Sequence, residues 1–162
     1  MLRYPSGFHF LRFWCVLLSW LALGCASVLR GQTAESSVGL DSGDGDAKLF
    51  FALGMIESGN DDRGIGRAGE VSRYQILPNV WKSYSESREY QNSDVSLLVA
   101  RRHWSYLTNY FRDNARREPT PFDMYVMWNT RFGYYARNGF DPDRVSPAVR
   151  ERAQRFVNLV NR

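Results

Sequence analysis

The chain has 162 residues, of which 44% are hydrophobic and 15% aromatic, and this predicts one compact domain with a sizeable core rather than two domains. Its formal charge is +4, from 21 basic and 17 acidic residues. The charge falls to +2 without the first 24 residues, which hold two arginines and no acid. This near balance argues against the concentrated basic face of a nucleic-acid-binding protein, and we expect no nucleic acid partner.

The first 24 residues have the organisation of a signal peptide. Arg3 and Arg12 precede a run of 12 mostly apolar residues, Phe13–Gly24. A helix that spans a bilayer needs about 20 apolar residues, whereas the core of a signal peptide has about 7 to 15. Residues 1–24 therefore predict that the chain is exported.

Two forms of processing remain open at Cys25. The segment Leu21–Cys25 resembles a bacterial lipobox, in which the cysteine becomes the lipidated first residue. This predicts a periplasmic or outer-membrane-associated lipoprotein, held to the membrane through Cys25. Alternatively, the small residues Gly24 and Ala26 form an ordinary cleavage site, and the protein is secreted. The other cysteine is Cys15, so no disulfide is expected in the rest of the chain.

Residues 25–45 are rich in serine, glycine and aspartate without apolar periodicity, which predicts a flexible tether. Residues 46–162 contain five segments with helical features and no alternating run that predicts a strand, so a mainly α domain is expected. The predicted helices are Ala47–Ser58 with Asp46 as N-cap, Asn79–Ser87, Val95–Arg117 with Asp94 as N-cap, Phe122–Trp128, and Pro147–Val160 with Ser146 as N-cap. The long helix 95–117 is expected to be central, and 60–70 and 129–135 are predicted loops.

Glu57 lies near the end of the first predicted helix, at the edge of an apolar stripe that includes Leu53 and Ile56. Partial burial raises the pKa of a glutamic acid and keeps it protonated, as cleavage of a glycosidic bond requires of the acid that protonates the leaving oxygen. Glu57 is therefore a candidate general acid. Many surface glutamates also have apolar neighbours, so companion residues must support this assignment.

Two further segments supply side chains of the kind that bind sugars. Gly69–Ile76 offers hydroxyl, amide and aromatic groups after a glycine-rich loop, and Asn129 lies at the end of a predicted helix. Each has an alternative interpretation: the first is equally typical of a buried turn, and asparagine is a common helix stop. The lone His103 is expected to be a packing or surface residue, and no His/Cys spacing indicates a metal site.

Together these segments resemble the motifs of the soluble lytic transglycosylases, a family of the lysozyme-like superfamily that cleaves peptidoglycan. Glu57-Ser58 matches the Glu-Ser that ends a helix in that family. Ser72-Arg73-Tyr74-Gln75-Ile76, followed by Pro78, is similar to its Gly-Leu-Met-Gln-Ile type motif. Met127-Trp128-Asn129-Thr130-Arg131 resembles, more loosely, its Ala-Tyr-Asn-Ala-Gly type motif. The resemblance covers roughly residues 47–159.

The resemblance implies a lysozyme-like single domain that acts as a peptidoglycan lytic transglycosylase, a lyase that cleaves the bond between N-acetylmuramic acid and N-acetylglucosamine. In that family the 6-hydroxyl of the muramic acid attacks in place of water and gives a 1,6-anhydro product, so one glutamate, here Glu57, serves as acid and then as base. The expected partner is a peptidoglycan strand, bound by a monomer without cofactor or metal. The residues expected to bind the strand are Ser58, Ser72, Tyr74, Gln75, Asn129 and Tyr135.

The sequence departs from the family pattern in the last segments. Phe156 stands where the family often has a tyrosine whose hydroxyl reaches the acid, and Tyr134 or Tyr135 is the expected substitute. Arg131 and Phe132 stand where the third motif has small residues. These departures put efficiency and substrate register in question more than the class of reaction.

Two alternatives to the transglycosylase remain open. If Glu70 faces Glu57, a hydrolytic muramidase with two carboxylates is feasible, with inversion at a separation of about 6.5–9.5 Å and retention near 5 Å. Asp61 and Asp62 are further candidates for the second carboxylate. The other alternative is a lysozyme-like module that binds the cell wall without cutting it.

Overall fold

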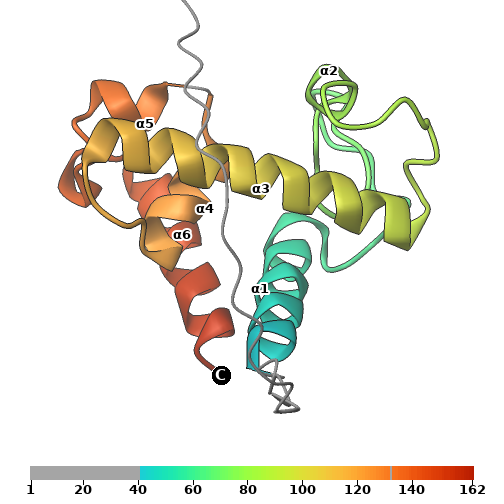
Figure 1. Ribbon diagram of the computed structural model, residues 1–162, viewed down its shortest axis with the longest axis horizontal. Helices are drawn as coiled ribbons and strands as arrows, with labels where there is room; N and C mark the ends of the chain where they lie inside the picture. Colours follow the sequence, from blue (N-terminus) through green and yellow to red (C-terminus); the bar gives the residue numbers. More distant parts are fainter. Residues whose placement is uncertain (1–40, 132) are drawn as a thin grey trace, which may run out of the picture. The chain divides into compact units, whose positions relative to one another are not determined.

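The structure of the chain, a computed structural model, describes residues 41–131 and 133–162. The predicted signal peptide, Cys25 and most of the predicted tether lie outside the described residues. Within the described residues the secondary structure is helical, with one isolated antiparallel bridge between Val71 and Ile76, and the predicted mainly α class is confirmed. The helices are α1 Asp41–Ser58, α2 Pro78–Trp81, α3 Ser93–Ala115, α4 Pro121–Asn129, α5 Tyr134–Arg137, the 3-10 helix η1 Pro142–Arg144 and α6 Pro147–Val160 (Figure 1).

The longest helix, α3, crosses above α1, α4 and α6 in the view of Figure 1. It begins two residues earlier than predicted because Asn92, rather than Asp94, is the N-cap: its side chain accepts hydrogen bonds from the backbone N–H of Asp94 and Val95, at 3.0 and 3.2 Å. It ends at Ala115, because the next residue, Arg116, has a left-handed backbone and its N–H bonds to the carbonyl of Arg112.

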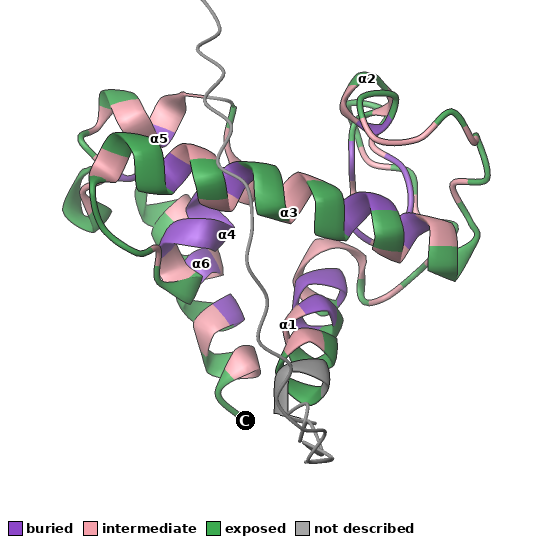
Figure 2. Cartoon of the chain, in the orientation of Figure 1, coloured by how far each residue is buried: buried purple, intermediate pink, exposed green. Residues whose placement is uncertain are grey.

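The shorter helix α4 forms the centre of the core. Its residues 123–127 are all buried, and it packs chiefly against α6 and also against α3 and α5 (Figure 2). Thr120 and Asp123 form a reciprocal capping box at its start, and Pro121 occupies the first turn. Helix α6 packs against both α4 and α1, so it connects this core to the helix that carries Glu57.

Several predicted boundaries are wrong for identifiable reasons. Helix α1 starts at Asp41, so residues 41–45 belong to it and not to a tether, and Asp46 lies inside it, paired with Arg101 at 2.5 Å. Helix α2 stops at Trp81, whose ring nitrogen donates to the Ser87 carbonyl at 2.7 Å, because the following residues turn back instead of continuing the helix. Part of the predicted loop 129–135 begins α5, and Ser146 precedes α6 without a side-chain cap.

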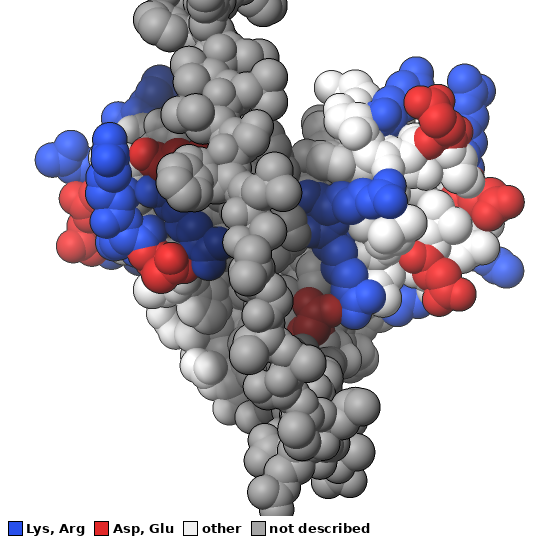
Figure 3. Space-filling view, in the orientation of Figure 1, with Lys and Arg blue, Asp and Glu red and all other residues white. Residues whose placement is uncertain are grey.

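The surface agrees with the near balance of charge. On the face shown in Figure 3, acidic side chains lie among the basic ones of the described residues. Among the described residues, no helix is both long and apolar enough to span a membrane.

Candidate active site

The end of α1 places Glu57 at the junction of three elements. Gly59 and Asn60 both adopt left-handed backbone conformations, with φ of 72° and 64°, and their N–H groups bond back to the carbonyls of Met55 and Gly54. The side chain of Asn60 packs closely on Gly54, because a Cβ there would lie 2.0 Å from the side-chain oxygen of Asn60. The chain therefore turns directly after Glu57, which stays in the last helical turn.

The carboxylate of Glu57 is held by side chains from α4 and α6. The hydroxyl of Tyr125 donates a hydrogen bond to Oε1 at 2.7 Å, and Nη2 of Arg152 lies 3.4 Å from Oε2. Nε of Arg152 also donates to the Tyr125 oxygen at 3.0 Å, which closes a triangle of three groups. Only 7% of the Glu57 side chain is exposed, so the carboxylate is nearly removed from water.

Burial and hydrogen bonding act on Glu57 in opposite directions. Burial is the largest influence and raises the pKa of its carboxyl above the ordinary value. The hydroxyl of Tyr125, the charge of Arg152 and the side chain of Asn129 each lower that pKa, and the charge of Glu70 raises it slightly. The net shift is upward. The site thus favours a protonated acid and still offers partners to the anion that remains after proton transfer.

A tight hairpin follows the glycine-rich loop and faces the end of α1. Val71 and Ile76 exchange backbone hydrogen bonds of 2.9 and 3.0 Å, and Ser72 and Gln75 have left-handed backbones. The side-chain amide of Gln75 donates to the carbonyls of Gly64 and Ser72, at 3.1 and 3.0 Å. Gln75 therefore joins the loop to the hairpin while its side chain remains partly exposed.

Three of the predicted substrate-binding residues are engaged within the fold. Ser58 donates to the carbonyl of Arg73 at 2.9 Å, which ties α1 to the hairpin. The Ser72 side chain is buried and accepts from the N–H of Tyr74, and the ring of Tyr74 is buried against Phe50. Ser72 is 1% exposed and Tyr74 is 4% exposed, so in this structure both side chains serve the hairpin and the core, and their binding of substrate stays a prediction.

The prediction that the hydroxyl of Tyr134 or Tyr135 reaches Glu57 is wrong. Tyr135 is buried and donates to Asp123 at 2.7 Å, and the hydroxyl of Tyr134 accepts from the N–H of Ser146. The hydroxyl that reaches Glu57 comes from Tyr125 instead. A signal for it exists in the sequence, since Tyr125 lies four residues before Asn129 and hence on the same face of a helix.

The other acids of the loop have local partners. Oε2 of Glu70 accepts from the N–H of Ala68 at 2.9 Å, although its charge still acts on Glu57. Asp62 forms a two-pronged ion pair with Arg73, and Asp61 accepts from the N–H of Arg63. Asp61 and Asp62 thus stabilise the loop and the hairpin.

Sequence reasoning missed Tyr125 and Arg152, while Glu57 and Asn129 are neighbours as expected. Among the described residues, no group of three His, Cys, Asp or Glu side chains is placed to hold a metal ion. Comparison with family models, curated proteins and solved structures finds no match to this chain.

Proposed function

We propose that this protein is a lysozyme-like peptidoglycan lytic transglycosylase in which Glu57 is the general acid and then the base. The observation that carries the proposal is the nearly buried carboxyl of Glu57, with its raised pKa, bonded to Tyr125 beside Asn129 and the hairpin. A buried glutamic acid whose ionised form also has partners is suited to give up a proton and later recover it.

The proposed reaction uses no water. Protonated Glu57 gives its proton to the glycosidic oxygen as the bond from C1 of the muramic acid breaks, and positive charge develops at C1. The 6-hydroxyl of the same sugar then attacks C1, and its proton passes to the Glu57 carboxylate. The products are a 1,6-anhydro sugar and a strand with a free hydroxyl, and Glu57 is again protonated.

Tyr125 and Arg152 have distinct parts in this scheme. The hydroxyl of Tyr125 fixes Oε1 at 2.7 Å and stabilises the anion between the two proton transfers. Arg152 sits farther away, at 3.4 Å, so its charge assists the anion without holding Glu57 permanently ionised. Asn129 and Gln75 have partly exposed polar side chains, and we assign them to substrate binding.

The proposal also includes export, either as a periplasmic or outer-membrane-associated lipoprotein anchored through Cys25 or as a secreted protein. Peptidoglycan lies outside the cytoplasmic membrane, so such a location would bring the enzyme to its substrate.

The test is digestion of purified peptidoglycan followed by mass analysis of the released sugars. We expect 1,6-anhydro products from the wild type and a decrease of about 10²- to 10⁴-fold for Glu57→Gln, the range typical of a lost general acid. Glu151→Gln, which neutralises an exposed glutamate on α6, is the matched control and should cut normally.

Other outcomes assign other functions. Reducing-end sugars without the anhydro form would indicate a hydrolytic muramidase, and loss of activity in Glu70→Gln would then identify its second carboxylate. Binding of peptidoglycan by a wild type that releases no sugar would indicate a cell-wall-binding module without catalysis.

A further inference from the structure

Helix α1 exposes two large apolar side chains on one face. Phe51 is 63% exposed and Met55 is 41% exposed. The two residues are four positions apart in the helix, so their side chains lie next to each other on its surface. Apolar side chains that cluster on a surface mark an interaction site, whereas scattered single ones need no explanation. We call Phe51 and Met55 the α1 stripe.

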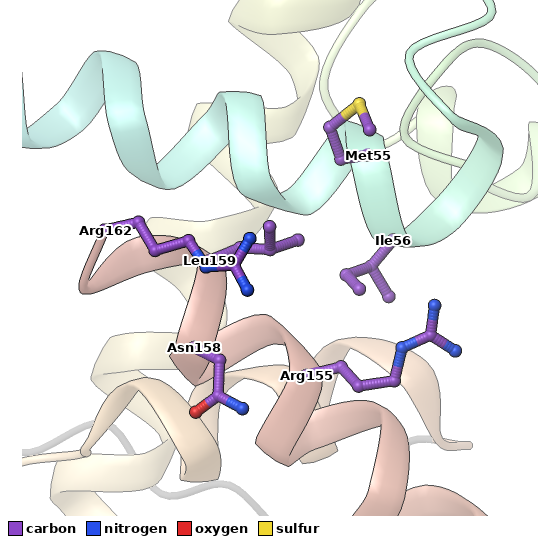
Figure 4. Close-up of a pocket in the computed structure, with 6 residues that line it drawn as sticks. All are labelled: Met55, Ile56, Arg155, Asn158, Leu159 and Arg162. Atoms are coloured by element: carbon purple, nitrogen blue, oxygen red, sulfur yellow. The ribbon is translucent and has the colours of Figure 1, made fainter.

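Cationic side chains border the α1 stripe. Lys48 is exposed and lies about one turn before Phe51. Met55 lines a pocket between α1 and α6 together with Arg155 and Arg162, and none of the six residues that line this pocket is acidic. Figure 4 shows that the side chains of Arg155 and Arg162 lie on the side of α6 that faces α1. The stripe is therefore apolar in the middle and positively charged around it.

The acids of α1 do not cancel this charge. Asp46 lies about 180° around the helix from Met55 and is paired with Arg101. Asp44 is on the side of the stripe, about one turn before Lys48. Among the described side chains named above, three cations thus border the stripe and one acid lies at its far end. This balance fits an anionic partner.

The α1 stripe faces away from the candidate acid. Glu57 follows Met55 by two residues, which is about 200° around a helix, and follows Phe51 by six residues, which is about 240°. The carboxylate of Glu57 contacts Tyr125 of α4 and Arg152 of α6. A partner bound to the stripe therefore leaves free the side of α1 that carries Glu57.

The length of chain before α1 indicates which partner can reach the stripe. Cys25, the predicted lipidation site, lies 16 residues before Asp41, where α1 begins. A flexible chain of this length spans about 20 Å on average and roughly 50 Å when fully extended. Phe51 is ten residues into α1, about 15 Å along its axis. A lipid at Cys25 would keep the stripe close to the bilayer, where a weak surface contact suffices for docking.

We propose that the α1 stripe docks on an anionic phospholipid membrane. Phe51 and Met55 enter the head-group region, and Lys48, Arg155 and Arg162 contact lipid phosphates. Apolar side chains bordered by lysine and arginine are typical of helices that lie at a membrane surface. Docking rests on the lipidation included in the proposed function and is independent of its chemistry. It orients the domain so that the side of α1 with Glu57 points away from the membrane.

The first test is sedimentation of the mature chain, residues 25–162, with vesicles of phosphatidylglycerol and phosphatidylcholine in equal parts. Cys25→Ser takes no lipid, so only the protein surface can bind. We expect binding, weakened about tenfold by Phe51→Ser with Met55→Ser. The control, Ile65→Ser with Leu98→Ser, changes side chains that are 79% and 45% exposed elsewhere and should bind like the parent. No binding by the parent, or an equal loss in the control, would overturn the proposal.

The same assay tests the cations. Arg155→Gln with Arg162→Gln should weaken binding to the anionic vesicles by about 10- to 30-fold, because each arginine near an anionic surface contributes about fivefold. The control, Lys82→Gln with Arg88→Gln, removes the same charge from exposed positions outside the pocket. An equal loss in the control would show that net charge, and not this surface, binds the membrane.

A polarity-sensitive dye locates the contact. The chain has no cysteine after Cys25, so Met55→Cys and Leu98→Cys each provide a single labelling position in the mature Cys25→Ser chain. Anionic vesicles should shift the emission of the dye at position 55 to the blue and leave that at position 98 unchanged. Equal shifts at both positions would overturn the proposal. A blue shift at position 55 that grows with protein concentration without vesicles would assign the stripe to a second copy of the chain instead. Sugar release is measured without vesicles, so a chain that docks but releases no sugar would contradict the proposed chemistry alone.

Discussion

Two carboxylates in this protein have the same kinds of partners and opposite properties. Glu57 and Asp123 are both nearly buried, and each contacts a tyrosine hydroxyl at 2.7 Å and an arginine. The pKa of Glu57 is raised and that of Asp123 is lowered. The difference lies in how many hydrogen bonds reach each anion.

Asp123 is fully satisfied as an anion. Burial raises its pKa, but this is outweighed by two bonds from Arg117, at 2.7 and 2.9 Å, by the N–H and hydroxyl of Thr120, and by the hydroxyl of Tyr135. Glu57 has one short bond from Tyr125, a more distant arginine and the side chain of Asn129, and these do not outweigh its burial. Burial with many donors fixes a charge for structure, whereas burial with few donors leaves a proton that can move.

The largest expected contrast concerns stability. Asp123→Asn should lower the free energy of unfolding by about 3 kcal/mol and the Tm by roughly 10 °C, because it breaks the Arg117 pair and the capping box of α4 together. Calorimetry of Asp123→Asn beside Asp113→Asn, an exposed aspartate of α3, checks this. A loss as small as that of the exposed control would mean that the network around Asp123 does not hold α4 in place.

The fold was predictable where local chemistry decides it. Helix α6 was predicted with its bounds, Pro147–Val160, because proline starts it and its apolar residues recur at helical spacing. Helix α2 was not, because its end depends on the contact between Trp81 and Ser87. His103 is confirmed as a packing residue: it contacts Trp128 and Tyr84, and burial lowers its pKa to about 4, so its ring is neutral at pH 7.

The site was predictable only in part, for a related reason. Glu57 is marked by its own helix and the turn after it, but its partners Tyr125 and Arg152 are 68 and 95 residues away in sequence. Tertiary packing brings these residues together, and no local sequence pattern indicates that they are in contact. Serine and tyrosine side chains can bind a sugar or form contacts within the fold. The residue types alone therefore did not predict that Ser72 and Tyr74 are buried.

The second contrast compares Tyr125, which contacts Glu57, with Tyr135, which contacts Asp123, and tests the pH dependence of activity. Tyr125→Phe removes a hydrogen bond that favours ionised Glu57, so the pKa of Glu57 should rise further. If protonated Glu57 is the active form, the alkaline limb of the kcat/KM profile moves to higher pH, and the maximal rate falls about tenfold because the anion loses a partner.

Tyr135→Phe is the matched control, since it also removes a hydroxyl bonded to a buried carboxylate. It should cost about 1–2 kcal/mol of stability and leave the pH profile of activity in place. A shifted profile in Tyr135→Phe, or none in Tyr125→Phe, would contradict the assignment of Tyr125 to the acid.

The smallest contrast is the dependence of stability on pH. The raised pKa of Glu57 means that the folded state binds its proton more tightly than the unfolded state, so this group destabilises the protein as pH rises from the unfolded value of about 4.3 through the folded pKa. Asp123 has the opposite sign: its lowered pKa contributes stability above an unfolded value of about 3.9, and this is lost as pH falls through the folded pKa.

Glu57→Gln cannot ionise at this position, so its Tm relative to wild type should increase between pH 4 and pH 7. The amount by which the Tm of Asp123→Asn lies below that of wild type should shrink as pH falls from 5 to 2. Calorimetric scans of the three proteins across this range measure both trends. Parallel curves for Glu57→Gln and wild type would show that Glu57 has the same proton affinity in the folded and unfolded chain, which would remove the physical basis for its role as an acid.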